Sequence, residues 1–365
     1  MRNVSGIAIL VVALVMAVGC GSGNTPTGNR TNASSPLPSS VPTETPVACG
    51  ATSTPCLVLV TLRGSDQSVV RDISDISHPK TVGGSSFQAR FISATEVAYI
   101  EALRLFRAPI SGGARNMVDT GSGGVVAFVV SPDGGSVVYL MYTNQQNAEV
   151  HLLQASKDRL LGGAPGLPDM AVSVPCTSQT CVDRSDYPVT YSPDGGLIMW
   201  NHNSGSAFRV WTAAGVDVTP ALGAPLMPVW TGSSLYFQDS KGIEVFRDGA
   251  VKPFLPGVSW IKPKASPLGG QIVYESRDST GLAHTYVVDT SSGAVRELGI
   301  GRSEPVFLTS RFIWNQGERL CTASESCDPA TPVKATGKTY IYDLQDGTES
   351  TSLITKVLDV WPHAA

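Results

Sequence analysis

Short apolar runs separated by turns recur along this chain from about residue 90 onward. Each repeat consists of an apolar run, a turn, and a second apolar run that ends on an aromatic residue. The two most similar copies share the turn Ser-Pro-Asp-Gly-Gly, at residues 131–135 and 192–196, and a third copy at residues 266–270 has Leu in place of the Asp. Pro and Gly favour tight turns, and Asp accepts hydrogen bonds from the backbone beside it, so the pattern predicts β-hairpins.

Six aromatic residues mark the period of this pattern, and successive ones lie 40, 61, 37, 37 and 40 residues apart. They are Tyr99, Tyr139, Trp200, Phe237, Tyr274 and Trp314. A period near 40 built from short strands is typical of a β-propeller, in which each four-stranded blade buries its faces against its neighbours. The sequence therefore predicts an all-β fold with six internal blades.

The two ends of the pattern predict one further blade. Residues 57–62, 68–72 and 80–83 have the composition of three strands with no first strand before them, and residues 357–361 have that of a first strand with nothing after it. Joined together, they would form a composite blade that closes the ring and removes its exposed edges. We therefore expect residues 48–365 to form a propeller of seven four-stranded blades. Six blades remain the alternative, if the N-terminal strands only cover an edge.

The repeat resembles that of the TolB-type β-propeller, a relative of the WD40 repeat. The resemblance rests on Ser-Pro-Asp-Gly, the apolar strand with its aromatic residue, and a Val-Val-Asp-like strand that ends in a Gly turn. It covers roughly residues 86–352, closely in two repeats and loosely in four. No repeat keeps the pattern through all four strands, and the chain lacks the additional N-terminal domain of TolB. The resemblance implies a propeller fold, but it does not imply TolB's role in an outer-membrane complex.

The N-terminal segment has the pattern of a processed export signal. Arg2 precedes an apolar stretch, residues 4–18, that is short for a transmembrane span. The stretch ends in Ala-Val-Gly before Cys20, which resembles a bacterial lipoprotein signal. We expect residues 1–19 to be removed and Cys20 to be lipidated, with an ordinary secretory peptide as the alternative.

The composition of the chain predicts a stalk beside a membrane and argues against nucleic acid as a partner. Residues 20–47 are rich in Gly, Ser, Thr and Pro and contain too few apolar side chains to fold, so they predict a flexible stalk. The formal net charge of −4 argues against binding to nucleic acid, because proteins that bind it carry an excess of Lys and Arg. We expect a monomer that is lipid-anchored on the extracytoplasmic side of a bacterial cell membrane.

The cysteines form local pairs once Cys20 is set aside. The pairs are Cys49 with Cys56, Cys176 with Cys181, and Cys321 with Cys327. All three lie among Ser, Thr and Pro residues, and in an exported protein they predict disulfides that each stabilise the fold by about 2 kcal/mol. Zinc binding is the alternative, but no histidine lies nearby and the spacings differ from those of zinc ribbons.

The sequence contains no recognisable catalytic or cofactor motif. It has no nucleophile elbow, no phosphate-binding loop, no His-Glu-x-x-His and no EF-hand loop, so we expect no enzymatic activity, no cofactor and no metal. Three predicted inner strands, residues 125–130, 227–230 and 305–308, are apolar, which argues against a site in the central channel.

Two long insertions, residues 161–188 and 316–338, hold two of the cysteine pairs. Propeller topology would place both insertions on one face, opposite the face that the stalk enters. Long loops on a rigid scaffold often bind partners, and a disulfide reduces the entropy lost on binding. We hypothesise that they bind a protein or envelope component. The candidate contact residues are Asp183, Arg184, Asp186, Arg319 and Glu325. The alternative is a small-ligand or carbohydrate binder, or an enzyme, that uses the central channel.

The anchor can be tested directly. We predict that Cys20→Ser releases the protein from the membrane or leaves the signal uncleaved, because acylation and lipoprotein-type cleavage both require the thiol. Cell fractionation with intact-mass analysis of the N-terminus measures both effects, and Cys49→Ser is the matched control. An unchanged N-terminal mass and membrane fraction in Cys20→Ser would contradict the prediction.

Overall fold

The computed structural model describes residues 57–62, 68–72, 75–82, 89–121, 123–144, 147–164, 189–201, 208–222, 225–327 and 332–361. All of them belong to one compact unit, Glu44–Ala365. The described residues form β-strands, turns and connections, and among them there is no helix long and apolar enough to cross a membrane. Cys20, the predicted signal and the predicted stalk lie outside the described residues.

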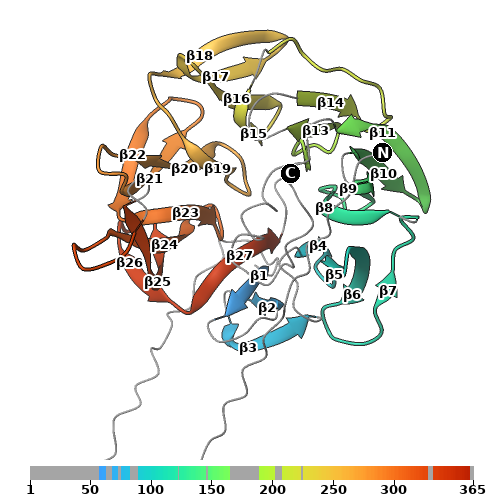
Figure 1. Cartoon of the computed structure of the whole chain (residues 1–365), viewed down its shortest axis with the longest axis horizontal. Helices are drawn as coiled ribbons and strands as arrows, with labels where there is room; N and C mark the ends of the chain where they lie inside the picture. Colours follow the sequence, from blue (N-terminus) through green and yellow to red (C-terminus); the bar gives the residue numbers. More distant parts are fainter. Residues whose placement is uncertain are drawn as a thin grey trace, which may run out of the picture. The chain divides into compact units, whose positions relative to one another are not determined.

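Six antiparallel sheets are each formed by strands that are consecutive in the chain, and they surround a common centre (Figure 1). The innermost strands are β4 (Ala89–Ser93), β8 (Gly124–Val130), β12 (Val189–Tyr191), β15 (Leu226–Thr231), β19 (Ile261–Ala265) and β23 (Arg302–Phe307). The second strands are β5 (Glu96–Glu101), β9 (Ser136–Asn144), β13 (Leu197–Asn201), β16 (Ser234–Asp239), β20 (Gln271–Arg277) and β24 (Phe312–Leu320).

The outer halves of these sheets complete the blades. The third strands are β6 (Arg104–Pro109), β10 (Asn147–Gln154), β14 (Phe208–Thr212), β17 (Gly242–Arg247), β21 (Ala283–Asp289) and β25 (Val333–Asp343). The outermost strands are β7 (Asn116–Met117), β11 (Lys157–Ala164), β18 (Ala250–Pro256), β22 (Val295–Ile300) and β26 (Glu349–Ser352). The sheet of β12, β13 and β14 has three strands within the described residues, and a single bridge from Trp211 to Asp217 lies at its outer edge.

The seventh sheet joins the two ends of the propeller domain, in the order β27 (Ile354–Trp361), β1 (Leu57–Leu62), β2 (Ser68–Asp72) and β3 (Asp75–Val82). β27 pairs antiparallel with β1, with Leu57 opposite Trp361. This arrangement confirms the predicted composite blade and the count of seven. The predicted last strand at residues 80–83 begins earlier, at Asp75.

The composite blade packs on both neighbours because side chains alternate between the two faces of a strand. Val58 and Val60 of β1 contact the cluster that includes Trp314, whereas Leu59 contacts the cluster that includes Phe91. The same alternation occurs around the ring, and the six repeat aromatic residues are each at most 2% exposed. The aromatic period of the sequence is therefore the period of blade-to-blade packing.

The Ser-Pro-Asp-Gly-Gly turns are held by their own side chains. Ser131 Oγ donates to Asp133 Oδ1 at 2.6 Å, and the same carboxylate oxygen accepts from the Gly135 amide at 2.9 Å. Gly134 has φ of 71°, a value that favours glycine. The copy at Ser192 and Asp194 has the same bonds.

The third copy shows what the turn loses without the Asp. Leu268 replaces it and is 76% exposed, and the buried hydroxyl of Ser266 has no hydrogen-bond partner. The Gly270 amide donates instead to Thr231 Oγ1 at 3.2 Å. The Asp residues of the intact turns thus have a structural role that involves no ligand.

We predict that Asp133→Leu and Asp194→Leu each lower the free energy of unfolding by about 1 kcal/mol, because each removes two hydrogen bonds. Chemical denaturation measures this loss, and Leu268→Ala is the control, with a change within about 0.5 kcal/mol. The hydroxyl and amide donors lower the pKa of both carboxyls. The stabilisation should therefore be complete above about pH 4, the unfolded-state pKa, and disappear as the pH falls through the folded-state pKa. A loss that is independent of pH would contradict this assignment.

Candidate functional site

The β24–β25 hairpin extends beyond the rest of its blade. β23 pairs with β24 only as far as Gly317, and β26 pairs with β25 from Thr339 onward. Beyond these points β24 and β25 pair with each other, with Arg319 opposite Lys334 and Leu320 opposite Val333. We call residues 319–334 the disulfide hairpin; residues 328–331 within it lie outside the described residues. Much of the predicted insertion at 316–338 is therefore a strand extension.

Gly317 lies at the base of this extension, where the register between the two strands shifts. A Cβ at this position would lie 2.5 Å from Thr336 Oγ1 and 2.8 Å from the ring of Tyr340. A side chain at this position would clash with both groups, so a glycine stands where the hairpin leaves the blade.

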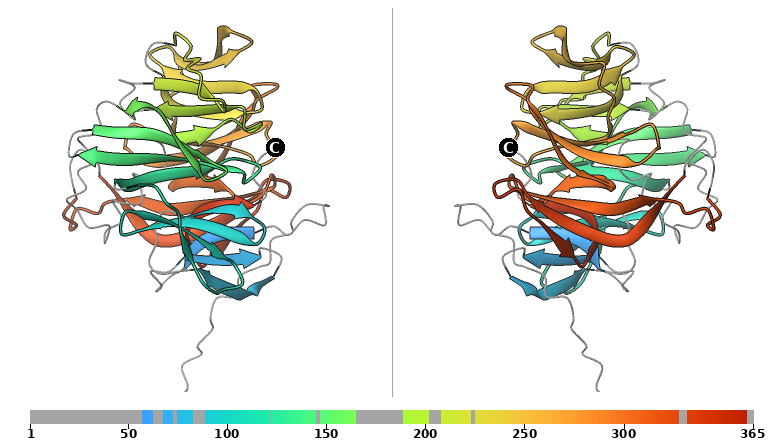
Figure 2. Two further views of the ribbon diagram at one scale, coloured as in Figure 1. Left: turned by 90° about the vertical axis from the view of Figure 1, so that its right-hand side faces the viewer. Right: turned by 90° about the vertical axis from the view of Figure 1, so that its left-hand side faces the viewer.

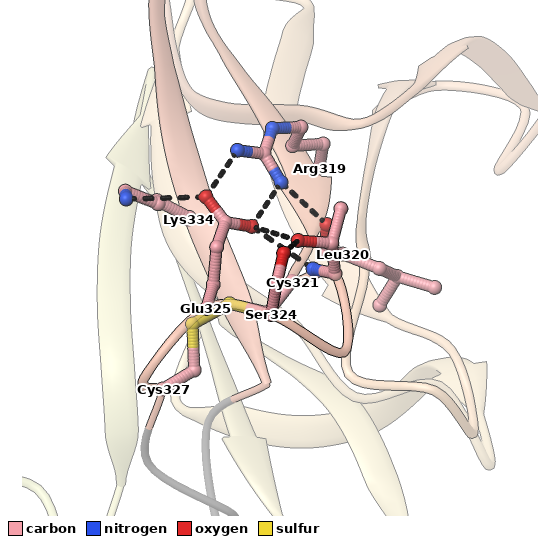
Figure 3. The surroundings of a disulfide bond; sticks show 8 residues. Arg319, Leu320, Cys321, Ser324, Glu325, Cys327 and Lys334 are labelled. Carbon is pink, nitrogen blue, oxygen red and sulfur yellow. Dashed lines mark hydrogen bonds and ion pairs between the residues drawn. A yellow bond between two sulfur atoms is a disulfide. The ribbon is translucent and has the colours of Figure 1, made fainter.

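A two-stranded hairpin is marginally stable on its own, and this one has two additional constraints. The first is the disulfide between Cys321 and Cys327, which confirms one of the three predicted pairs. The second is the carboxylate of Glu325, which accepts two bonds from Arg319, at 2.6 and 2.7 Å, and one from the Thr322 amide at 2.9 Å (Figure 3). Lys334 Nζ lies 3.3 Å from the same carboxylate. The paired donation from Arg319 holds the pKa of Glu325 well below its usual range.

The structure brings Arg319 and Glu325 together within the loop, and their charges compensate each other. The contacts between these two residues stabilise the disulfide hairpin. A contact of either residue with a partner stays a prediction. The other predicted contact residues, Asp183, Arg184 and Asp186, lie outside the described residues. The same is true of Cys49, Cys56, Cys176 and Cys181. Residues 161–164 of the other predicted insertion belong to β11.

The topology sets the face from which the disulfide hairpin emerges. All second strands run in the same direction because the blades repeat one order from inner to outer strand. The start of a second strand and the end of another therefore lie on opposite faces of the ring, which Figure 2 shows edge-on. β1 begins at Leu57 on one face, and β24 ends at Leu320, beside Cys321, on the other.

The central channel holds charged residues that the sequence reasoning missed. A cavity of about 260 Å³ lies among the inner strands β4, β8, β12, β19, β23 and β27. Its charged lining residues are Arg90, Lys262, Lys264, Glu304, Lys356 and Asp359. The expectation of an apolar channel was wrong in this respect, because the strands predicted to be apolar contribute none of these charges within their predicted bounds. Five of the six come from β4, β19 and β27, and Glu304 lies one residue before the apolar run in β23.

Two of these lining residues, Lys262 and Glu304, stand at a bulge that recurs in the inner strands. Met227, Lys262 and Glu304 have φ of 46°, 49° and 52°, and each precedes a proline. The pairing of their strands shifts register at the same points. Left-handed backbone in a residue before proline is disfavoured, so it occurs where the surrounding fold imposes it. In the sequence, these bulges are marked by a proline that interrupts the inner strand directly after the left-handed residue.

The described residues contain no group of three or more His, Cys, Asp or Glu side chains that could hold a metal ion.

No family model and no curated protein matches this chain. Among solved structures, the tricorn protease matches with a TM-score of 0.51 and 12% identity, over 83% of this chain and 34% of that one. A functionally unknown protein from Desulfotomaculum acetoxidans matches with the same score and identity, over 83% and 98%. TolB from Acinetobacter baumannii matches with a TM-score of 0.47 and 14% identity, over 84% and 66%. The chain thus spans a third of the protease and less than two thirds of TolB. The likeness at a score of 0.51 supports the propeller fold and nothing beyond it.

We predict that loosening the disulfide hairpin leaves the propeller folded. In a variant with Cys321→Ser, Cys327→Ser and Glu325→Ala, the amides of Cys321, Thr322 and residue 325 should exchange hydrogen roughly tenfold faster, because their bonds within the loop are lost or weakened. Exchange at Trp314 and Ile341 in the blade core should not change. Lys334→Ala, which removes only the 3.3 Å contact, is the control. Faster exchange throughout the blade would show that the hairpin supports the fold itself.

Proposed function

We propose that this protein is a lipid-anchored propeller on the extracytoplasmic side of a bacterial membrane, and that it binds a protein or envelope component through its disulfide hairpin. The observation that supports this proposal best is the doubly constrained hairpin on a rigid blade. A disulfide and a bidentate ion pair hold one short loop in shape, beyond the part of the blade where β23 and β26 pair with its strands.

The constrained loop favours binding for an entropic reason. A flexible loop loses conformational freedom when a partner fixes it, and each ordered side chain costs about 0.5–1.5 kcal/mol. The disulfide and the Arg319–Glu325 pair reduce this cost because they already hold residues 319–327 in one shape before contact.

The surface of the hairpin suits a protein partner. Leu320 is a large apolar residue with 41% exposure, and the side chains of Arg319 and Lys334 beside it are 43% and 56% exposed. An apolar contact surrounded by polar and charged groups is the usual composition of a protein interface. The proposal includes no catalytic role, in agreement with the lack of catalytic motifs in the sequence.

The proposed anchor and the proposed contact surface are compatible. The chain enters the ring at Leu57, on the face opposite the disulfide hairpin. An anchor that approached this face would leave the disulfide hairpin on the far face of the ring.

We predict that replacing residues 317–338 by Asn-Gly abolishes partner capture and preserves the fold. Gln316 lies directly opposite Thr339, so a two-residue turn joins the shortened strands in register. Trp314 and Ile341 remain in the core. Photo-crosslinking in intact cells, with the photoreactive residue at Ala323, measures contact, and the same residue at Leu268, on the opposite face and 76% exposed, is the matched control.

The expected result is a discrete crosslinked species from Ala323 that is absent from Leu268 and that affinity capture by the shortened variant fails to recover. Equal capture by the folded, shortened variant would place the binding surface elsewhere on the protein. Loss of folding would be recognised by its thermal melt.

A further inference from the structure

The central channel is a second feature that the proposed docking surface does not explain. The cavity of about 260 Å³ adjoins another of about 260 Å³, and the two share lining residues from five inner strands. The shared residues are Arg90, Val129, Thr190, Lys264, Ala265 and Asp359. Three charged residues, Arg90, Lys264 and Asp359, therefore lie where the two cavities adjoin.

The lining of the first cavity is cationic, whereas the whole chain is acidic. Four of its six charged residues are Lys or Arg and two are acidic, which leaves a formal excess of two positive charges. The chain as a whole has a formal net charge of −4. A concave site of one charge sign focuses the electrostatic potential and attracts ions of the opposite sign. The channel thus differs from the rest of the protein in the sign of the charge it presents.

The two acidic residues already bind groups of the protein. Glu304 Oε1 accepts from Lys262 Nζ at 2.8 Å, and Asp359 Oδ2 accepts from the Phe91 amide at 2.7 Å. Arg90 is oriented by bonds to the carbonyl oxygens of Ala89, at 2.9 Å, and Leu358, at 2.7 Å. These bonds hold Arg90 and the two carboxylates in place before any ligand arrives, and preorganised charges bind more strongly than mobile ones.

Two charged residues of the channel lining have a strained backbone. The bulge at Met227 shows that a left-handed residue before proline also occurs in an inner strand where the residue is apolar. At the equivalent positions of β19 and β23, however, the residues are Lys262 and Glu304, and both line the channel. The bulges therefore place a bonded pair of opposite charges, Lys262 and Glu304, in the channel lining at a cost in backbone strain.

The walls between the charges are apolar and indicate the kind of ligand. Ala127, Phe128 and Val129 of β8 and Val306 of β23 line the same cavity. Such a site fits a ligand with a charged head and an apolar body better than an inorganic ion.

We propose that the channel binds a small organic anion, with Lys264, Lys356 and Arg90 attracting its carboxylate or phosphate head and the valine and phenylalanine side chains contacting its apolar part. The proposal does not depend on the disulfide hairpin, because its residues lie on the inner strands.

The test uses the full-length protein and four defined compounds. Succinate, phenylacetate and phenyl phosphate are the anions, and phenylacetamide is the neutral counterpart of phenylacetate. Isothermal titration and thermal melts are measured at low and at high salt. We expect at least one anion to bind with a Kd below about 1 mM, more weakly at high salt, and phenylacetamide to bind at least about tenfold more weakly than phenylacetate. Preference for phenylacetate or for phenyl phosphate identifies the head group.

Three variants assign the binding to the channel. Lys264→Gln with Lys356→Gln should weaken anion binding about tenfold or more, because two charge-assisted contacts are lost. Lys264→Arg keeps the charge and should retain most of the affinity. Lys334→Gln, on the disulfide hairpin, should bind like the unmodified protein. The proposal is overturned if none of the anions binds below about 1 mM, if phenylacetamide binds as well as phenylacetate, or if the double variant keeps its melt and its affinity.

Discussion

The pairing of β27 with β1 brings the last and the first described strands of the chain side by side, and both interfaces of the composite blade depend on it. Val58 and Val60 belong to the same hydrophobic cluster as Trp314 of one neighbour, and Leu59 belongs to the same cluster as Phe91 of the other. Without this pairing, two neighbouring blades would expose apolar faces and β1 would expose an unpaired edge. The channel depends on it as well, because β27 contributes Lys356 and Asp359 to the lining.

Much of the fold could be predicted because blade packing leaves a regular trace in the sequence. Each blade needs a large buried residue on its second strand, so aromatic residues recur from Tyr99 to Trp314 at the spacing of the blades. The composite blade could be predicted from incomplete repeats at the two ends. The Cys321–Cys327 pair could be predicted from its locality, and the structure confirms it.

The contacts within the sites could not be predicted in the same way. Arg319 and Glu325 were recognised as polar loop residues, but their pairing depends on how the disulfide hairpin bends back on itself. The channel was missed for a related reason. Alternation along a strand predicts which side chains share a face, and a bulge changes that assignment. Lys262 and Glu304 stand at such bulges, so their direction follows from backbone geometry that the apolar pattern does not record.

The closing pair also determines when the ring can form during synthesis. Leu57 and Trp361 are direct neighbours in the sheet, yet almost the whole domain is made between them. Blades such as β19–β22 contain only consecutive strands and can form as the chain lengthens, whereas β1 waits for a strand at the far end. Contacts between residues so distant in the chain form slowly, because a large loss of chain entropy precedes their gain. A chain without β27 would contain six blade sequences and no means of closing them, so completion of the ring waits until β27 has been made.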